Sequence, residues 1–267
     1  MKKLQYLAVT VFAVILLTGC GQKKQEVTEM INAKDHQKVS ERLAMYADVN
    51  IDVDMSMLTE RERQLVKKLI EAGNLVDEIF WMQSSHDAIT LRDSLMGVQD
   101  QAGKDFLAYV NINYGPYDRI FEGERFVGHG PARKPAGAGL YPEGLTKEEF
   151  EEWVDAHPDQ KTAMESQYTV VVRDGDQLRA IPYHQQYPQT AKIAALLNQA
   201  ADLADNPSLK KYLQLRAKAI ASDDYFESDM AWMDLKENNI DVVIGPIENY
   251  EDGLFNYKTA FECAVVV

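Results

Sequence analysis

The sequence predicts an α+β fold that is mainly helical and contains a small antiparallel or mixed β-sheet. Helical periodicity dominates residues 36–112 and returns between residues 146 and 236. Two runs rich in β-branched and aromatic residues, at 168–183 and 240–267, predict the strands. Hydrophobic residues make up 46% of the chain and charged residues 26%, which is typical of a globular protein with a sizeable core.

The first predicted elements are helices. Thr59 and Glu62 form a capping box, and apolar residues then recur every three or four positions from Leu65 to Ile79. This pattern predicts one long amphipathic helix. Shorter helices are expected near residues 37–48, 86–98 and 101–110, and the stretch 113–141, rich in glycine and proline, predicts a long loop.

The second half of the chain alternates helices with short strands. Thr146 and Glu149 form a second capping box, opening a helix that ends near His157. Asp174 and Gly175 predict the turn of a β-hairpin formed by residues 168–173 and 177–183. Two helices are then expected at about residues 189–204 and 207–221.

A further helix and two strands complete the prediction. Asp223 is suited to cap a helix that reaches about residue 236. A strand is expected at 240–244, followed by a break at Gly245-Pro246 and a strand-like run at 257–267. Because the sequence stops inside that last run, we expect the domain to continue beyond Val267 and the chain to be truncated there.

The N-terminus predicts export and a lipid anchor. Lys2 and Lys3 precede an apolar run from Leu7 to Leu17 that is too short to span a membrane but suits a signal peptide. The run ends in Leu17-Thr18-Gly19-Cys20, which resembles the bacterial lipobox. We therefore expect residues 1–19 to be a signal peptide, Cys20 to carry lipid, and residues 20–35 to be a tether. The alternative is a buried hairpin helix at the start of a globular domain.

Charge and cysteine content narrow the possible partners. The formal charge is −14, and removal of residues 1–19, which contain two lysines and no acid, gives −16. This charge disfavours nucleic acid and anionic membrane surfaces as partners. With Cys20 lipidated, Cys263 has no disulfide partner and is interpreted as a small buried residue. The expected location is the cell envelope, on a membrane outside the cytoplasm.

Residue types and spacing alone indicate few catalytic or binding sites in this sequence. The histidines lack metal-ligand spacing, and the glycines of residues 128–139 fit no nucleotide-binding fingerprint. The acidic residues between 223 and 234 are explained by helix capping and a solvated helix face. Glu248 and Tyr250 follow a predicted strand, where a carboxylate beside a phenol can bind an ammonium group and donate to an oxyanion. Turn formation explains the same residues without any function.

Three segments in the last fifty residues resemble the dipeptidyl-peptidase III family of zinc exopeptidases. These segments are Tyr225–Asp234, Ile240–Asp252 and Phe261-Glu262. The segments Asn113–Arg119 and Lys134–Gly137 resemble the bacterial lipoprotein branch of that family, whose members often carry the misleading label dihydrofolate reductase. The resemblance covers roughly residues 40–267 and implies that residues 36–267 form the first, N-terminal lobe of a two-lobed peptidase.

The resemblance also implies roles for individual residues. Glu248 is similar to the glutamate that binds the N-terminal ammonium of a peptide, and Tyr250 to a catalytic tyrosine that supports the scissile carbonyl. Asn249 and Glu262 are expected to help bind substrate. The family uses zinc, but its H-E-x-x-x-G-H motif and later glutamate are absent, so we expect no zinc or other metal, and no nucleotide, to bind this chain.

Two functions remain in competition at this point. The first is the N-terminal part of a membrane-tethered zinc dipeptidyl peptidase that releases dipeptides from peptide substrates and is inactive on its own. The second is a non-catalytic envelope lipoprotein that binds peptides or a protein partner.

Overall fold

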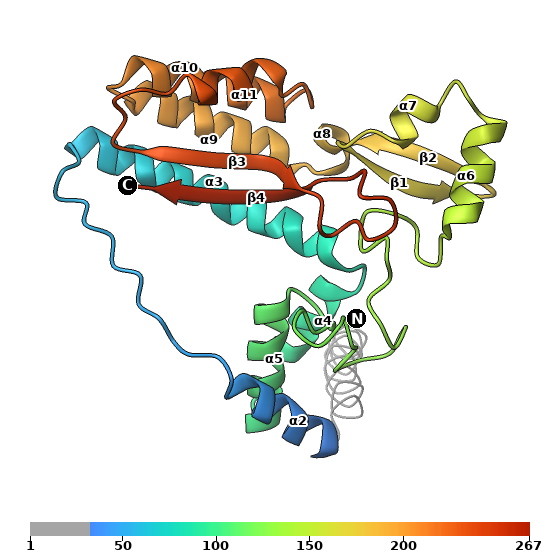
Figure 1. Ribbon diagram of the computed structural model, residues 1–267. Coiled ribbons are helices and arrows are strands. Elements are labelled where there is room, and N and C mark those ends of the chain that lie inside the picture. The colour runs from blue at the N-terminus through green and yellow to red at the C-terminus, as the bar shows by residue number, and fades with distance from the viewer. Residues whose placement is uncertain (1–32) are drawn as a thin grey trace, which may run out of the picture. The chain divides into compact units, whose positions relative to one another are not determined.

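The computed structural model describes residues 33–267 (Figure 1). The signal peptide, the lipidated Cys20 and nearly all of the tether predicted from the sequence lie outside the described residues. The described part contains ten helices and two antiparallel sheets of two strands each, so the predicted α+β class is confirmed. It divides into two compact units, which are described separately.

The first unit ends at Val49 and resumes from Asp87 to Lys134. Its helices are α2 (Ala33–Leu43), α4 (Ala88–Met96) and α5 (Gln101–Asn113). The loop that follows α5 is fixed by the buried Asp118, which accepts from Arg42 at 2.7 Å and from Tyr109 at 2.5 Å. The glycines of residues 128–130 pack around the guanidinium of Arg125. These contacts give the predicted glycine-rich loop a structural role.

The second unit comprises residues 50–86 and 135–267 and is built on the long helix α3 (Glu60–Ser84). Its predicted capping box is present, since Thr59 accepts from the Glu62 backbone and Glu62 accepts from the Thr59 backbone. The buried face of α3 packs on α9 and β4. The remaining elements are α6 (Lys147–Ala156), α7 (Lys161–Met164), β1 (Thr169–Asp174), β2 (Gln177–Pro182), α8 (Tyr183–Gln186), α9 (Gln189–Leu203), α10 (Pro207–Ile220), α11 (Phe226–Met233), β3 (Asp241–Glu248) and β4 (Ala260–Val266).

Several predicted boundaries are wrong. The first helix ends at Leu43, before the expected residue 48. Thr146 caps α6, but the Glu149 side chain binds Arg173 at 2.7 Å. Asp223 does not cap α11, because its carboxylate accepts from the backbone N–H and ring of His184.

The predicted break at Gly245-Pro246 is also wrong. Strand β3 runs through both residues to Glu248 and pairs with β4, with a shift in register between Pro246 and Glu248. The backbone N–H of its partner Phe261 points away from β3, since it donates to the side chain of Gln83. Residues 246 and 261 therefore face each other as a non-hydrogen-bonded pair, in which β4 needs no N–H donor from residue 246, so proline fits here. Glu248 therefore lies at the end of a strand, which holds it more rigidly than a loop would.

No helix in residues 33–267 combines the length and the apolar character needed to cross a bilayer.

Candidate functional site

The β3–β4 hairpin brings two predicted substrate-binding residues together. Glu262 pairs with Gly245 across the hairpin, and Glu248 pairs with Ala260. Both glutamates are half-buried. In the part of the chain that the structure describes, neither carboxylate has a hydrogen-bond or ion-pair partner. Burial, and then the negative charges of Glu248 and Glu251, raise the pKa of Glu262. The hairpin therefore concentrates negative charge that pairs with no cation within residues 33–267.

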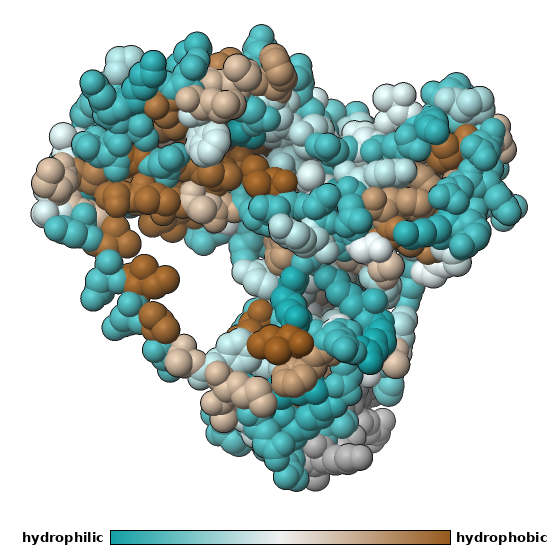
Figure 2. Space-filling model, viewed as in Figure 1, coloured by the Kyte–Doolittle hydropathy of each residue, from teal (hydrophilic) through white to brown (hydrophobic). Residues whose placement is uncertain are grey.

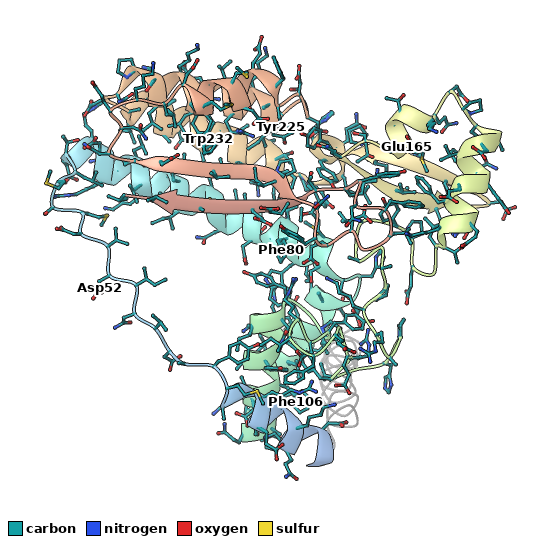
Figure 3. All side chains as sticks on the ribbon, viewed as in Figure 1. Asp52, Phe80, Phe106, Glu165, Tyr225 and Trp232 are labelled. Carbon is teal, nitrogen blue, oxygen red and sulfur yellow. The ribbon has the colours of Figure 1, made fainter. Side chains whose placement is uncertain are left out.

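These two glutamates line a pocket of about 530 Å³. Its other lining residues come from α10, α11 and the outer face of the hairpin: Tyr212, Arg216, Asp229, Trp232, Met233, Val243, Ile247 and Ala264. Trp232 lies on α11, close to β3 in Figure 3, and its indole N–H donates to Asp241 at 3.0 Å. Most of the lining is apolar, and hydrophobic residues gather over this part of the molecule in Figure 2. The pocket thus offers mostly apolar walls, and the two carboxylates form part of its lining.

Arg216 supplies the positive charge of the pocket. It is 4% exposed, and its guanidinium lies 5.4 Å and 5.3 Å from the ring centroids of Tyr212 and Tyr225. One terminal nitrogen donates to Asp229 at 2.5 Å, while the buried Nε has no hydrogen-bond partner among the described residues. Since Asp229 already neutralises Arg216, the two glutamates retain their excess charge.

The β3–β4 loop, residues 249–259, carries the other two predicted site residues. The Asn249 amide donates to the backbone carbonyl of Asn256 at 3.0 Å, so it closes the loop. The Tyr250 side chain is 82% exposed and does not line the pocket. The structure therefore brings Glu248 and Glu262 together but places Tyr250 on the surface beside them.

Asp252 holds this loop in place from within. It is fully buried and accepts hydrogen bonds from four backbone N–H groups and one hydroxyl: Leu254, Phe255, Tyr257, Lys258 and the phenol of Tyr141. A carboxylate that accepts several backbone N–H groups fixes the path of a loop strongly. The position of Asn249 and Tyr250 depends on this buried group.

Lys258 anchors the far end of the loop. Its ammonium group donates to the carbonyls of Met164 and Ser166 and to the hydroxyl of Thr169, at 2.5, 2.8 and 2.7 Å. Burial lowers the pKa of this lysine to about 7, against the opposing effect of Asp252. The sequence alone assigned no role to Asp252, Lys258 or Arg216. Asp252 nevertheless lies within Ile240–Asp252, one of the segments that resemble the family.

The described residues do not provide a zinc site. Within residues 33–267, no three His, Cys, Asp or Glu side chains are arranged to hold a metal ion. The acidic residues of 223–234 are used otherwise: Asp223 pairs with His184, Asp229 with Arg216 and Glu227 with Lys218. The zinc that the family resemblance implies does not fit any group of residues within 33–267.

Comparison with solved structures identifies the fold. The chain superposes on dipeptidyl-peptidase III from Caldithrix abyssi with a TM-score of 0.82 and 44% identity, over 85% of its own length. The corresponding values for dipeptidyl-peptidase III from Corallococcus sp. strain EGB are 0.82, 35% and 86%. The resemblance to dipeptidyl-peptidase III is confirmed. The chain corresponds to one part of that structure, covering 43% of each solved chain.

Sequence comparison gives one further relative. The chain is 30% identical over 275 aligned residues to Nudix hydrolase 3 of Arabidopsis thaliana, an alignment that covers 84% of this chain and 36% of the plant protein. No protein-family model matches the sequence. The chain spans 43% of each solved chain and 36% of the plant protein.

Proposed function

We propose that this chain is the peptide-binding part of a dipeptidyl-peptidase III-type enzyme, and that it recognises the free N-terminus of its substrate. The observation that carries the proposal is the pair of half-buried glutamates, Glu248 and Glu262, which share one pocket without a cationic partner in residues 33–267. An ammonium group placed between them would neutralise this charge and donate charge-assisted hydrogen bonds to the two carboxylates. The structural match to dipeptidyl-peptidase III supports the same interpretation.

The pocket also favours a particular kind of peptide. Trp232, Met233 and Val243 form part of its apolar lining next to the glutamates. A peptide whose ammonium group lies at the carboxylates therefore places its first side chains on an apolar surface, and burial of each such side chain contributes about 1.5–3 kcal/mol. We accordingly propose peptides with apolar N-terminal residues as the substrate class.

The proposal also assigns this chain a role in catalysis, which is to position the peptide for cleavage. Release of dipeptides by the family depends on zinc, and the residues described here supply binding and no metal site. The role proposed for this chain is to fix which peptide bond is presented for cleavage by holding the N-terminus. The proposed setting is the cell envelope, with the chain anchored through lipid on Cys20.

Titration calorimetry with trivaline and N-acetyl-trivaline tests the binding proposal. Acetylation removes the ammonium charge and should weaken binding about tenfold to a hundredfold, the equivalent of one charge-assisted hydrogen bond. Glu248→Gln and Glu262→Gln should weaken the binding of trivaline similarly and leave N-acetyl-trivaline unaffected. Asp159→Asn, a change at an exposed acid that does not line the pocket, is the control. Equal affinity of the wild-type chain for both peptides would reject the proposal.

The competing function, a lipoprotein that binds peptides without cleaving them, makes the same prediction for binding. The two functions differ in whether dipeptides are released. Because residues 33–267 supply no metal site, the test uses the protein expressed from its complete reading frame. Incubation of that protein with zinc and a dipeptidyl-naphthylamide separates the two functions, because only a peptidase releases the naphthylamine.

A further inference from the structure

The segment at residues 50–55 has the pattern of a β-strand but no partner. Its sequence, Asn-Ile-Asp-Val-Asp-Met, alternates polar and apolar residues. Ile51, Val53 and Met55 are 85%, 54% and 41% exposed. Figure 1 shows this part of the chain as an extended connection, and in Figure 2 hydrophobic and hydrophilic residues alternate along it. A period of two places the apolar side chains on one face, as in a strand with one buried face.

The backbone of this segment is almost free of hydrogen bonds. Among the described residues, the Met55 carbonyl accepts from the backbone of Leu58 and from the side chain of Arg63, and Asp54 accepts from the Ser56 backbone. These contacts form the turn that leads into α3. The N–H and C=O groups of residues 50–53 are left open to a neighbouring strand.

Strand β4, in the same unit, has a free edge that could receive such a strand. One edge of β4 pairs with β3. The Phe261 N–H points away from β3, since it donates to the side chain of Gln83 at 2.7 Å. Backbone groups alternate along a strand, so those of Cys263 and Val265 face the same outer edge as Phe261. No strand within residues 33–267 pairs with that edge.

The packing of α3 on β4 sets the direction of approach. Gly73 lies against the Cys263 side chain, and Gln83, further along the helix, binds the start of β4 at Phe261. Helix α3 therefore runs antiparallel to β4, and its N-terminus lies towards the C-terminal end of the strand. A segment that leads into α3 and lies along β4 must run parallel to β4, in a strand–helix–strand arrangement.

We propose that residues 50–55 pair as a parallel strand with the free edge of β4. Ile51 and Val53 then lie on the α3 side of the sheet, next to Cys263 and Val265, and their exposed apolar surface becomes buried. Asp52 and Asp54 lie on the opposite face. The register that places them beside Ala264 and Val266, and away from Glu262, avoids like charges as neighbours.

Disulfide formation with the native Cys263 tests the pairing. In a Cys20→Ser chain, single cysteines are introduced at 51 and 53 on the predicted inner face and at 52 and 54 on the outer face. Neighbouring strands place Cα atoms about 5 Å apart, within the range of a disulfide. After oxidation at alkaline pH, we expect Ile51→Cys and Val53→Cys to form the intramolecular disulfide at least about tenfold more than Asp52→Cys and Asp54→Cys.

Three results would overturn the proposal. Equal disulfide yields at all four positions would show that the segment has no fixed face, and disulfide-linked dimers would show pairing with a second copy. Hydrogen exchange measured on the chain without introduced cysteines tests the pairing independently, in case the substitutions themselves disturb the segment. Pairing should slow exchange of alternate amides in residues 50–55 at least about tenfold relative to an unfolded peptide, because only a hydrogen-bonded amide is protected. Exchange of all these amides at the rate of an unfolded peptide would exclude the pairing.

Discussion

Asp252→Asn should destabilise the second unit and displace the loop next to the pocket. The wild-type carboxylate accepts from two backbone N–H groups with each oxygen, and from Tyr141 in addition. Asparagine keeps one oxygen and turns an NH₂ group towards two of these backbone donors. Each buried donor left without an acceptor costs about 1–3 kcal/mol, so the expected loss is about 2–6 kcal/mol.

Thermal unfolding followed by circular dichroism measures this loss. For a unit of this size, 1 kcal/mol lowers Tm by about 2–4 °C, so a loss of about 2–6 kcal/mol should make Asp252→Asn melt about 4–24 °C below the wild type. Tyr141→Phe removes one of the five hydrogen bonds and should cost only about 1 kcal/mol. Asp159→Asn, at an exposed site, is the control. An Asp252→Asn protein that melts within about 1 °C of the wild type would refute the assignment of Asp252 as the organiser of the loop.

Four further changes probe other parts of the chain. Gly139→Ala should cost about 3 kcal/mol or more in chemical denaturation, because a Cβ there would overlap the Met82 carbonyl oxygen; a cost below 1 kcal/mol would contradict this packing. Burial and Glu248 raise the pKa of Glu262, so its stabilising contribution at low pH is lost as the pH rises through the raised value. Glu262→Gln should therefore raise Tm at pH 7 but not at pH 4, and an equal effect at both would oppose the argument. Because burial raises the pKa of the Cys263 thiol to about 11, iodoacetamide at pH 8 should modify it far more slowly than free cysteine, as mass spectrometry will show. Cys20→Ser should move the protein from membrane to soluble fractions; sedimentation with membranes after a high-salt wash would argue against the lipid anchor.

The helices were the most predictable part of the fold. The capping residues Thr59 and Asn206 and the apolar periodicity after Thr59 are local signals, and the helices begin where these signals predict. The β1–β2 hairpin was equally predictable from its Asp-Gly turn. In each case the residues that determine the element are neighbours in the sequence.

The errors arose where distant residues decide the local structure. Gly245-Pro246 is a break signal in isolation, yet β3 continues because Pro246 faces Phe261 in a non-hydrogen-bonded pair, with the Phe261 N–H directed to Gln83. Asp223 is a good helix cap in isolation, yet it binds His184. Neither of these two contacts can be inferred from the spacing of residues along the sequence. The same limit applies to the site, because Glu248 and Glu262 share one pocket only through the register of the hairpin.

The unfavourable ionisation of Glu262 in the pocket explains why the pocket should prefer a ligand that carries an ammonium group. Burial, and then repulsion from the negative charges of Glu248 and Glu251, oppose ionisation of Glu262 and raise its pKa. A neutral or anionic ligand leaves that repulsion in place, whereas an ammonium group removes it. Binding of a free N-terminus should therefore favour ionisation of Glu262 and release a proton under mildly acidic conditions. Calorimetry in buffers of different ionisation enthalpy detects this release: trivaline should show it, and N-acetyl-trivaline or the Glu262→Gln chain should not. If the binding enthalpy of trivaline does not depend on the buffer, Glu262 does not contact the ammonium group.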